Sequence, residues 1–411
     1  MYPVGYKMSG KIKLLIFLLL IILLFLLRAI TNMIDLKVNN QSTAKLKSSS
    51  SYDSEFVVLP QSMISPRKAY CIDGSPPAYN IKLMSTMKKW ILHLESGAWC
   101  SSVRACESRS KTRLGSSKFE AKTRRLEGLM SSNPKINPDF YQWNIVEFLY
   151  CDGSSFLGNL SKPINYHGKD LYLRGAVIFE IIVEHLLKNT NIGMADLVLL
   201  TGSSAGGLAS LIHADHLRQT LPKTVTTVKN VVDGSLFLDQ KSTTDEHLMK
   251  NMLKETFELH NIKDSLILRK CTDQRAETDK WQCFMPEVFM KYTQTPTFYF
   301  NSYFDTWYGR SPLKLGCWFS NLPCSSKEND VTKDLQTALM QVTHKILEKD
   351  SNGIFLTSCI CHTIMNNYRF ARVVSQGITG STALKWWLNN EPRGKKIIDV
   401  LENQNSWKNC F

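Results

Sequence analysis

The residue best placed to do chemistry in this chain is the serine at the centre of Gly202-Ser203-Ser204-Ala205-Gly206. An apolar run at 197–200 precedes this G-x-S-x-G pattern, and a helix-like run at 208–221 follows it. A nucleophilic serine often occupies a sharp turn between a strand and a helix, where small flanking residues allow a strained backbone. A Gly- and Ser-rich segment can also be only a turn, but this context favours Ser204 as a nucleophile for acyl transfer.

A serine esterase also needs a general base and a carboxylate that orients this base. Asp305 and His362 follow the apolar runs 297–303 and 353–359, and they continue the chain order Ser, Asp, His of the α/β-hydrolase fold. The alternatives are an ordinary turn residue for Asp305 and a structural histidine for His362. Asp233, after a shorter apolar run, is a competing carboxylate.

The loop Glu95-Ser96-Gly97-Ala98-Trp99-Cys100 follows an apolar run at 90–94. Its small residues would let the backbone approach a substrate carbonyl, and backbone N–H groups stabilise the oxyanion of acyl transfer. We expect Gly97 and Ala98 to supply such N–H groups together with Ala205; the alternative is a simple tight turn.

These candidates require a scaffold that brings distant segments together. Strand-like runs at 90–94, 143–150, 197–200, 297–303 and 353–359 alternate with helix-like runs at 175–188 and 207–221. This alternation predicts an α/β fold of the α/β-hydrolase type, with a mostly parallel central sheet and helices on both faces. The candidate residues follow strand ends, where ligands bind in such sheets. The polar stretch 241–292 is interpreted as an insertion or cap.

The composition indicates a globular and basic protein. The chain has 411 residues, 43% hydrophobic residues and a formal net charge of +14. A basic surface attracts polyanions. Because no nucleic-acid-binding motif accompanies the charge, we expect no nucleic-acid partner.

The N-terminal region differs from the rest. An unbroken apolar run at 14–27 follows three lysines, which predicts for residues 1–30 a signal peptide or an uncleaved signal anchor with the remainder outside the cytoplasm. The polar, Ser-rich residues 31–64 are expected to form a flexible stem, and residues 65–411 the catalytic domain. Such a protein would attach to a membrane only through an uncleaved N-terminal segment.

Eleven cysteines favour a disulfide-bonded protein of the secretory pathway. Asn40 and Asn159 then become candidate glycosylation sites, because each begins an N-x-S sequon. Cys359 and Cys361 precede His362 with a spacing that could suggest a metal, but no second ligand cluster accompanies them, so no metal is expected.

Together the motifs resemble the plant pectin acetylesterase family, which has the animal relative Notum. The resemblance covers residues 68–410 and rests on these stretches: 70–79 (YCIDGSPPAY), 95–100 (ESGAWC), 112–117 (TRLGSS), 137–141 (NPDFY), 150–156 (YCDGSSF) and 204–210 (SAGGLAS). It implies an α/β-hydrolase-like fold, no metal or other cofactor, and a triad of Ser204, Asp305 and His362. It also implies the disulfides Cys71–Cys151 and Cys100–Cys106, to which sequence proximity adds Cys317–Cys324.

The implied activity is hydrolysis of O-acetyl esters of pectin, a polyanionic substrate. We expect the protein in the cell wall, or in the Golgi or plasma membrane as a type II single-pass protein. This sequence departs from the family pattern at Ser96 and Ala98, which replace glycines, at Ser203, which replaces a cysteine, and at Thr363, which follows His362 in place of a cysteine. A side chain on the 95–100 loop would be strained if its residue needs a positive φ. Two alternatives therefore stay open: a catalytically weak paralogue that binds acidic polysaccharide, and an esterase for another acyl group.

Overall fold

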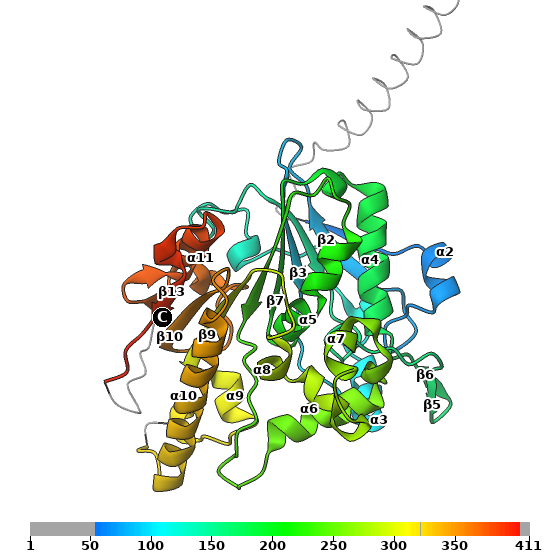
Figure 1. Ribbon diagram of the computed structural model, residues 1–411. Coiled ribbons are helices and arrows are strands. Elements are labelled where there is room, and N and C mark those ends of the chain that lie inside the picture. The colour runs from blue at the N-terminus through cyan, green and yellow to red at the C-terminus, as the bar shows by residue number, and fades with distance from the viewer. Residues whose placement is uncertain (1–53, 321, 403–411) are drawn as a thin grey trace, which may run out of the picture. The chain divides into compact units, whose positions relative to one another are not determined.

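Parallel strands form the centre of the fold. The computed structural model describes residues 54–320 and 322–402, all within one unit, Tyr52–Phe411. A nine-stranded sheet has the order β1-β2-β4-β3-β7-β8-β9-β10-β13. Figure 1 shows this sheet, with β2, β3, β7, β9, β10 and β13 labelled. Its strands are β1 (Glu55–Val58), β2 (Ala78–Lys82), β3 (Lys89–Leu94), β4 (Asn144–Phe148), β7 (Leu197–Ser203), β8 (Thr227–Asp233), β9 (Thr297–Phe304), β10 (Gly353–Ile360) and β13 (Lys396–Ile398).

Every neighbouring pair from β4 to β13 is parallel, whereas at the other end of the sheet β2 is antiparallel to both β1 and β4. The expected mostly parallel α/β fold is therefore confirmed. The five predicted strands correspond to β3, β4, β7, β9 and β10. Two small antiparallel hairpins lie outside the sheet, β5 (Ile164–Tyr166) with β6 (Lys169–Leu171) and β11 (Val374–Ser375) with β12 (Ile378–Thr379).

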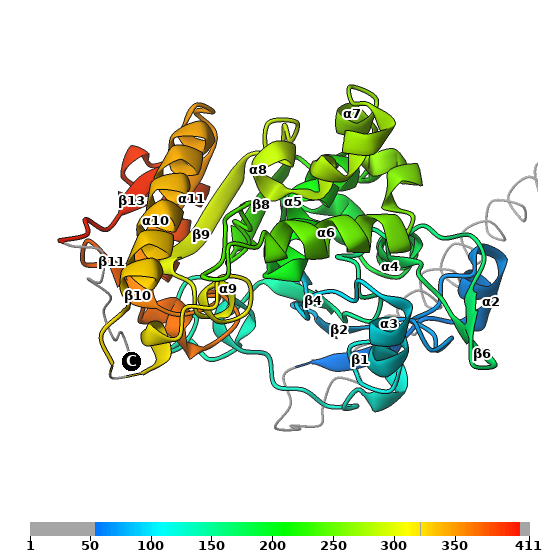
Figure 2. The same ribbon diagram turned by 90° about the horizontal axis from the view of Figure 1, so that it is seen from below.

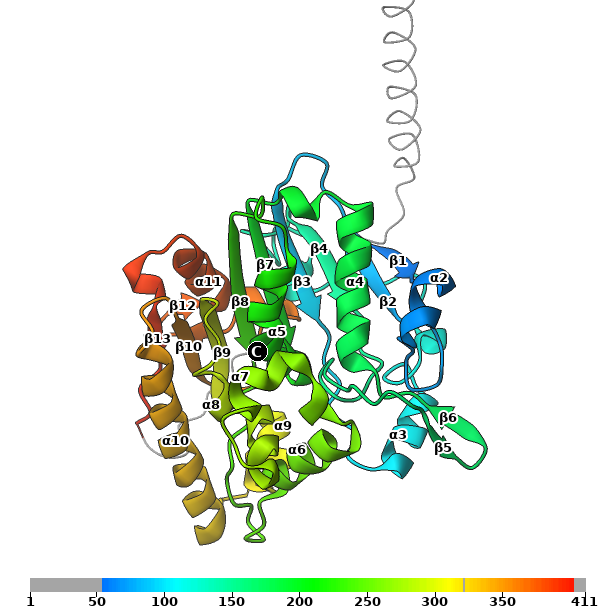
Figure 3. The same ribbon diagram turned by 45° about the vertical axis from the view of Figure 1, so that its right-hand side comes forward.

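Helices complete the unit. They are α2 (Gln61–Ile64), α3 (Val103–Ser110), α4 (Gly175–Asn189), α5 (Ala205–Thr220), α6 (Leu248–Leu259), α7 (Arg269–Thr272), α8 (Pro286–Phe289), α9 (Thr306–Arg310), α10 (Ser326–Leu347) and α11 (Gly380–Leu388). Figure 3 shows α4 and α5 lying across one face of the sheet. In a view from below, α10 and α11 lie near β10 and β13 (Figure 2).

The strands bury both faces, as alternation of side chains along β3 shows. Trp90, Leu92 and Leu94 belong to the larger apolar core, which includes residues of α4, α5 and α10. Ile91 belongs to a second core, which includes residues of α11 and of the segment 126–143. Such two-sided burial explains the near-continuous apolar runs in the sequence.

The folded unit begins earlier than residue 65. Residues of β1 pair with those of β2, from Glu55 with Ile81 to Val58 with Ala78, and Leu59 is buried. The C-terminal part of the expected stem, 54–64, is thus part of the domain, because its backbone extends the sheet. The stretch 241–292 holds α6, α7 and α8, so it is more helical than the polar sequence suggested.

No helix among residues 54–320 and 322–402 is long and apolar enough to cross a membrane. The apolar run 14–27, predicted to be a signal peptide or anchor, and the Asn40 sequon lie outside the described residues.

Candidate active site

Ser204 lies on a sharp turn between β7 and α5. Its φ of 54° and ψ of −124° place it in a region that non-glycine residues rarely adopt. A Cβ at Gly202 would lie 2.0 Å from the Gly206 carbonyl oxygen, and one at Gly206 would lie 2.1 Å from that of Leu94. The two glycines of G-x-S-x-G are therefore required by close backbone packing.

Contacts with the neighbouring strand hold this turn in place. The Ser204 N–H donates to the Asp233 carbonyl at 2.8 Å, and the Ser235 hydroxyl donates to the Ser204 carbonyl at 2.7 Å. Ser204 itself is only 4% exposed. A strained backbone persists where its surroundings fix it in this way.

Asp305 and His362 are in direct contact. Nδ1 of His362 lies 2.9 Å and 2.8 Å from the two carboxylate oxygens of Asp305. The same carboxylate accepts the Tyr308 N–H at 2.9 Å and so caps α9. The turn role considered for Asp305 and its contact with His362 thus occur together.

This contact sets the electrostatics of the imidazole. Burial alone lowers the pKa of His362, but the charge and hydrogen bond of Asp305 outweigh burial, so the pKa lies above its usual value. Because Nδ1 donates to the carboxylate, Nε2 is left as the basic nitrogen. The ring also stacks on Trp307, with centroids 5.8 Å apart.

Asp233, the competing carboxylate, has a different role. Its side chain accepts the N–H groups of Ile364 and Met365 and the Ser203 hydroxyl, at 2.8–3.0 Å. Burial raises the pKa of Asp233 to about 6, against the effect of the hydrogen bonds from Met365, Ile364 and Ser203. Asp233 therefore joins the nucleophile turn to the loop after His362, and Ser203 supplies a hydroxyl where the family pattern has a cysteine.

Asp233 thus contacts both the Ser204 turn and the segment that follows His362. A Cβ at Gly234 would lie 3.2 Å from the Thr363 N, which places the loop after β8 against the residue after His362. The structure brings Asp305 and His362 into hydrogen-bond contact, whereas among the described residues the Ser204 hydroxyl makes no hydrogen bond with the imidazole. Hydrogen bonds of catalytic groups often tighten only when substrate binds.

The carbonyl groups of the 95–100 loop are held by two side chains. Arg109 donates to the carbonyls of Gly97 and Trp99 at 2.6 and 3.1 Å, and the Tyr150 hydroxyl donates to that of Ala98 at 2.8 Å. In a trans peptide the N–H points opposite to the carbonyl. The N–H groups of Ala98 and Trp99 therefore point away from these two side chains, and neither has a hydrogen-bond partner in the described part of the chain.

Ser155 links this loop to the nucleophile turn. Its N–H donates to the Tyr150 hydroxyl at 2.9 Å, and its own hydroxyl accepts the indole N–H of Trp99 and donates to the Ala205 carbonyl, both at 2.7 Å. We call Tyr150, Ser155 and Arg109 the loop network. Tyr150 and Ser155 belong to the 150–156 motif, but the sequence predicts no role for them, because their partners lie about 50 residues away.

Two of the four departures from the family pattern place a side chain on strained backbone. Ala98 has a φ of 52° and Thr363 a φ of 59°, so both carry a side chain in the left-handed region. Ser96 does not have a positive φ. At Gly97 a Cβ would lie 2.5 Å from the Tyr150 ring, so this glycine is needed for space.

Disulfides cross-link several segments of the described chain. The structure contains Cys71–Cys151, Cys100–Cys106, Cys317–Cys324 and also Cys271–Cys283, which was not predicted. Cys361 is a buried free thiol whose pKa is raised by burial.

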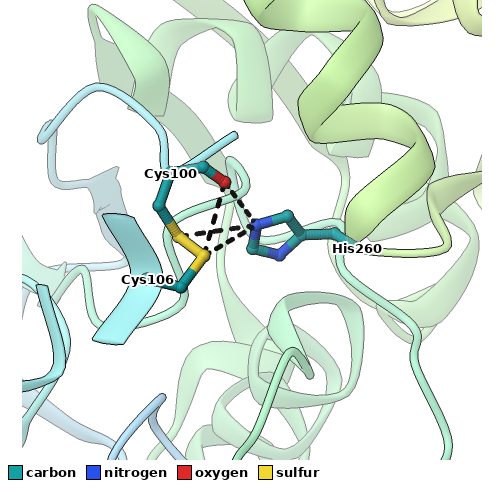
Figure 4. A group of neighbouring side chains, drawn as sticks. All are labelled: Cys100, Cys106 and His260. Atoms are coloured by element: carbon teal, nitrogen blue, oxygen red, sulfur yellow. Dashed lines mark hydrogen bonds between the residues drawn. A yellow bond between two sulfur atoms is a disulfide. The ribbon is translucent and has the colours of Figure 1, made fainter. Parts of the chain in front are cut away.

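Nε2 of His260 lies 3.6 and 3.7 Å from the sulfur atoms of Cys100 and Cys106 (Figure 4). The sulfurs are in a disulfide and therefore cannot act as thiolate ligands to a metal. Instead, His260 is 2.9 Å from the Cys100 carbonyl and anchors the end of the 95–100 loop to the C-terminus of α6.

The predicted sequon residue Asn159 is half-buried. Its side chain contacts the Asp264 carbonyl and the Arg174 guanidinium, each at 3.3 Å. Glycosylation at Asn159 stays a prediction.

Comparison with known proteins identifies the family. The family model for pectinacetylesterase matches residues 48–410. The chain belongs to the pectinacetylesterase family. It is 33% identical over 358 residues to pectin acetylesterase 5 of Arabidopsis thaliana, covering 82% of this chain and 81% of the relative. It is 29% identical over 335 residues to the palmitoleoyl-protein carboxylesterase NOTUM of Schmidtea mediterranea, covering 77% of this chain and 60% of the relative.

The solved structure of the Wnt deacylase Notum from Drosophila has the same fold, with a TM-score of 0.73 at 24% identity, covering 86% of this chain and 97% of that one. Pectinacetylesterase family members and Notum are carboxylic ester hydrolases. The disulfides and the likeness to plant pectin acetylesterases indicate the secretory pathway.

Proposed function

We propose that this pectinacetylesterase family member is a serine esterase that removes O-acetyl groups from pectin, with Ser204, His362 and Asp305 as its triad. The observation that carries the proposal is the pair of hydrogen bonds from His362 to Asp305, next to the segment that holds the Ser204 turn. Family membership supports the substrate class, because the plant relatives are named pectin acetylesterases.

In this mechanism Nε2 of His362 accepts the Ser204 proton while Oγ attacks the acetyl carbonyl. The tetrahedral intermediate collapses as the imidazolium returns the proton to the departing sugar oxygen, which leaves an acetyl-serine. Water, deprotonated by the same imidazole, then hydrolyses this ester and releases acetate. Asp305 keeps the imidazole in the required tautomer and stabilises its charged form.

The oxyanion would be stabilised by the N–H groups of Ala98, Trp99 and Ala205. Those of Ala98 and Trp99 are aimed by the loop network, and that of Ala205 belongs to the first turn of α5, where helix N–H groups lack intrahelical partners. In this proposal Gly97 provides close approach of the loop, and its own N–H is not required.

A cluster of three rings favours a small acyl group. Phe237 contacts Trp99 at a centroid distance of 5.1 Å and Trp307 at 5.6 Å, and Trp307 in turn stacks on His362. Phe237 and Trp99 are buried, so they fill space beside the loop and the base. A long acyl chain would need an apolar cavity there, whereas an acetyl group would not.

Turnover of acetylated pectin is the direct test. Acetate release is measured for the wild type, Ser204→Ala and the control Ser203→Ala, which removes the neighbouring hydroxyl. Loss of the nucleophile is expected to lower kcat by roughly 10⁶-fold, while Ser203→Ala should retain most of the activity. Equal activity of Ser204→Ala and the wild type would end the triad assignment.

A second candidate is a weak paralogue that binds acidic polysaccharide without efficient turnover. The positive φ of Ala98 and Thr363 favours it, because each costs about 1–2 kcal/mol and Ala98 lies where donors must be aligned. Acetate release from pectin at a rate typical of esterases would exclude this candidate.

We further propose an extracellular site of action in the cell wall, or a Golgi or plasma-membrane location if residues 1–30 remain as a type II anchor. Detection of residues 1–30 in the protein purified from its source, by N-terminal sequencing, decides between the two.

A further inference from the structure

A cavity of about 350 Å³ is lined by three arginines, Arg113, Arg124 and Arg125. It also reaches Ser96, which directly precedes Gly97 of the 95–100 loop, and Asn366. The Asn366 side chain accepts a hydrogen bond at 3.0 Å from Thr363, the residue after His362. The cavity, which we call the guanidinium cleft, thus lies next to the 95–100 loop and to the segment that follows His362.

The guanidinium groups have donors to spare. Arg113 uses only Nη1, which contacts Glu95 at 2.7 Å and Glu120 at 3.5 Å. Arg124 also uses only Nη1, which contacts Glu95 at 2.9 Å and Glu147 at 3.6 Å. Among the described residues, Nε and Nη2 of both arginines have no hydrogen-bond partner, and Arg125 is exposed and has none at all. An arginine edge with two free N–H groups matches a carboxylate in a bidentate geometry.

The guanidinium groups of Arg113 and Arg124 are held in place by Glu95 before any ligand binds. The Glu95 carboxylate is buried, accepts from both Arg113 and Arg124, and accepts the Tyr150 N–H at 3.0 Å. Pre-organised arginine lowers the entropy lost when a ligand binds. Because Glu95, Glu127 and Glu147 also line the cleft, its net charge is small, and recognition depends on directed donors instead of a broad positive potential.

We propose that the guanidinium cleft is a subsite for the carboxylate of a uronate residue in the substrate chain, adjacent to the acetylated sugar. This inference rests on the proposed function, because it assumes that a polysaccharide ester reaches Ser204. A polyuronate presents one carboxylate on every ring. A chain that places an acetyl group at Ser204 would therefore bring the carboxylate of the same or a neighbouring ring toward Arg124 and Arg125.

The test measures binding and turnover separately. Arg125→Gln removes an exposed guanidinium that has no structural partner, so the full-length variant is expected to fold. Its matched control is Arg218→Gln, an exposed arginine 14 residues beyond Ser204 on α5 and therefore roughly 21 Å along this helix. Unacetylated oligogalacturonate serves as the binding probe, and its Kd is measured by calorimetry.

Arg125→Gln should raise the Kd for oligogalacturonate about tenfold, as expected for the loss of a charge-assisted hydrogen bond. It should raise KM for acetylated polygalacturonate similarly, with kcat and the hydrolysis of p-nitrophenyl acetate unchanged. Arg218→Gln should match the wild type throughout. An unchanged Kd in Arg125→Gln, or no binding of the oligogalacturonate by the wild type, would overturn the subsite. If the proposed esterase function is wrong, the wild type itself would hydrolyse none of these esters, and its Kd for oligogalacturonate would not be affected.

Discussion

Replacing Tyr150 with phenylalanine isolates the contribution of the loop network to turnover. The Tyr150 hydroxyl donates to the Ala98 carbonyl and accepts the Ser155 N–H, at 2.8 and 2.9 Å. Burial raises the pKa of Tyr150, so the phenol stays protonated and remains a donor. Its removal changes almost no volume but leaves a buried carbonyl and a buried N–H without their partner.

The magnitudes follow from these two contacts. Each of the two unpaired buried groups costs about 1–3 kcal/mol, so the free energy of unfolding should fall by about 2–6 kcal/mol. Complete loss of one oxyanion donor costs about 10²–10³ in kcat. Arg109 still holds the carbonyls of Gly97 and Trp99, so we expect partial misalignment of the Trp99 N–H and a loss of roughly tenfold to a hundredfold in kcat.

The assay is steady-state hydrolysis of p-nitrophenyl acetate, together with chemical denaturation. KM should change little, because the oxyanion exists only in the transition state. The control is Tyr79→Phe, which removes a hydroxyl contact of 2.9 Å with His185 between β2 and α4. This variant should lose stability and keep its kcat. A destabilised Tyr150→Phe enzyme with wild-type kcat would refute the argument that the network aims the donors.

Three further predictions concern the base, the 95–100 loop and the acyl group. Asp305→Asn should lower kcat by about 10⁴. It should also shift the acidic limb of the pH–kcat/KM profile to lower pH, because Asp305 raises the pKa of His362 and the base is active only when neutral; a limb that stays in place would contradict the pairing. Ala98→Gly relieves a positive φ and should raise the free energy of unfolding by up to about 1 kcal/mol, and an unfolding midpoint below that of the wild type would contradict the strain. Phe237→Ala should raise kcat/KM for octanoyl relative to acetyl p-nitrophenyl esters by about tenfold, since removing a ring opens space beside Trp99; an unchanged ratio would show that the ring cluster does not limit acyl length.

The sequence predicted those features that depend on short segments. The turn at Ser204 follows from two glycines that no larger residue could replace, and the runs before Asp305 and His362 correspond to β9 and β10. The structure brings Asp305 and His362 into direct contact, while their catalytic roles stay a prediction. The sequence predicts strain at the 95–100 loop if a residue with a side chain has a positive φ there, and Ala98 has one.

Features that depend on distant partners could not be predicted. Asp233 was considered a rival to Asp305, but only the fold shows that it accepts N–H groups 131 and 132 residues away. Tyr150 and Ser155 contact the 95–100 loop and α5 across about 50 residues, and no local pattern encodes such a pairing. The long helix α10 was also missed, since many of its positions are polar and exposed and its apolar positions form only one stripe.

In the proposed mechanism Ser204 is a nucleophile activated by His362. The most direct measurement is peptide mass spectrometry after exposure of the full-length protein to a fluorophosphonate, which reacts with activated serines. We expect a single adduct on Ser204 in the wild type, none in Ser204→Ala and strongly slowed labelling in His362→Ala. An adduct on a different serine, or labelling of Ser204 at the same rate without His362, would contradict this mechanism.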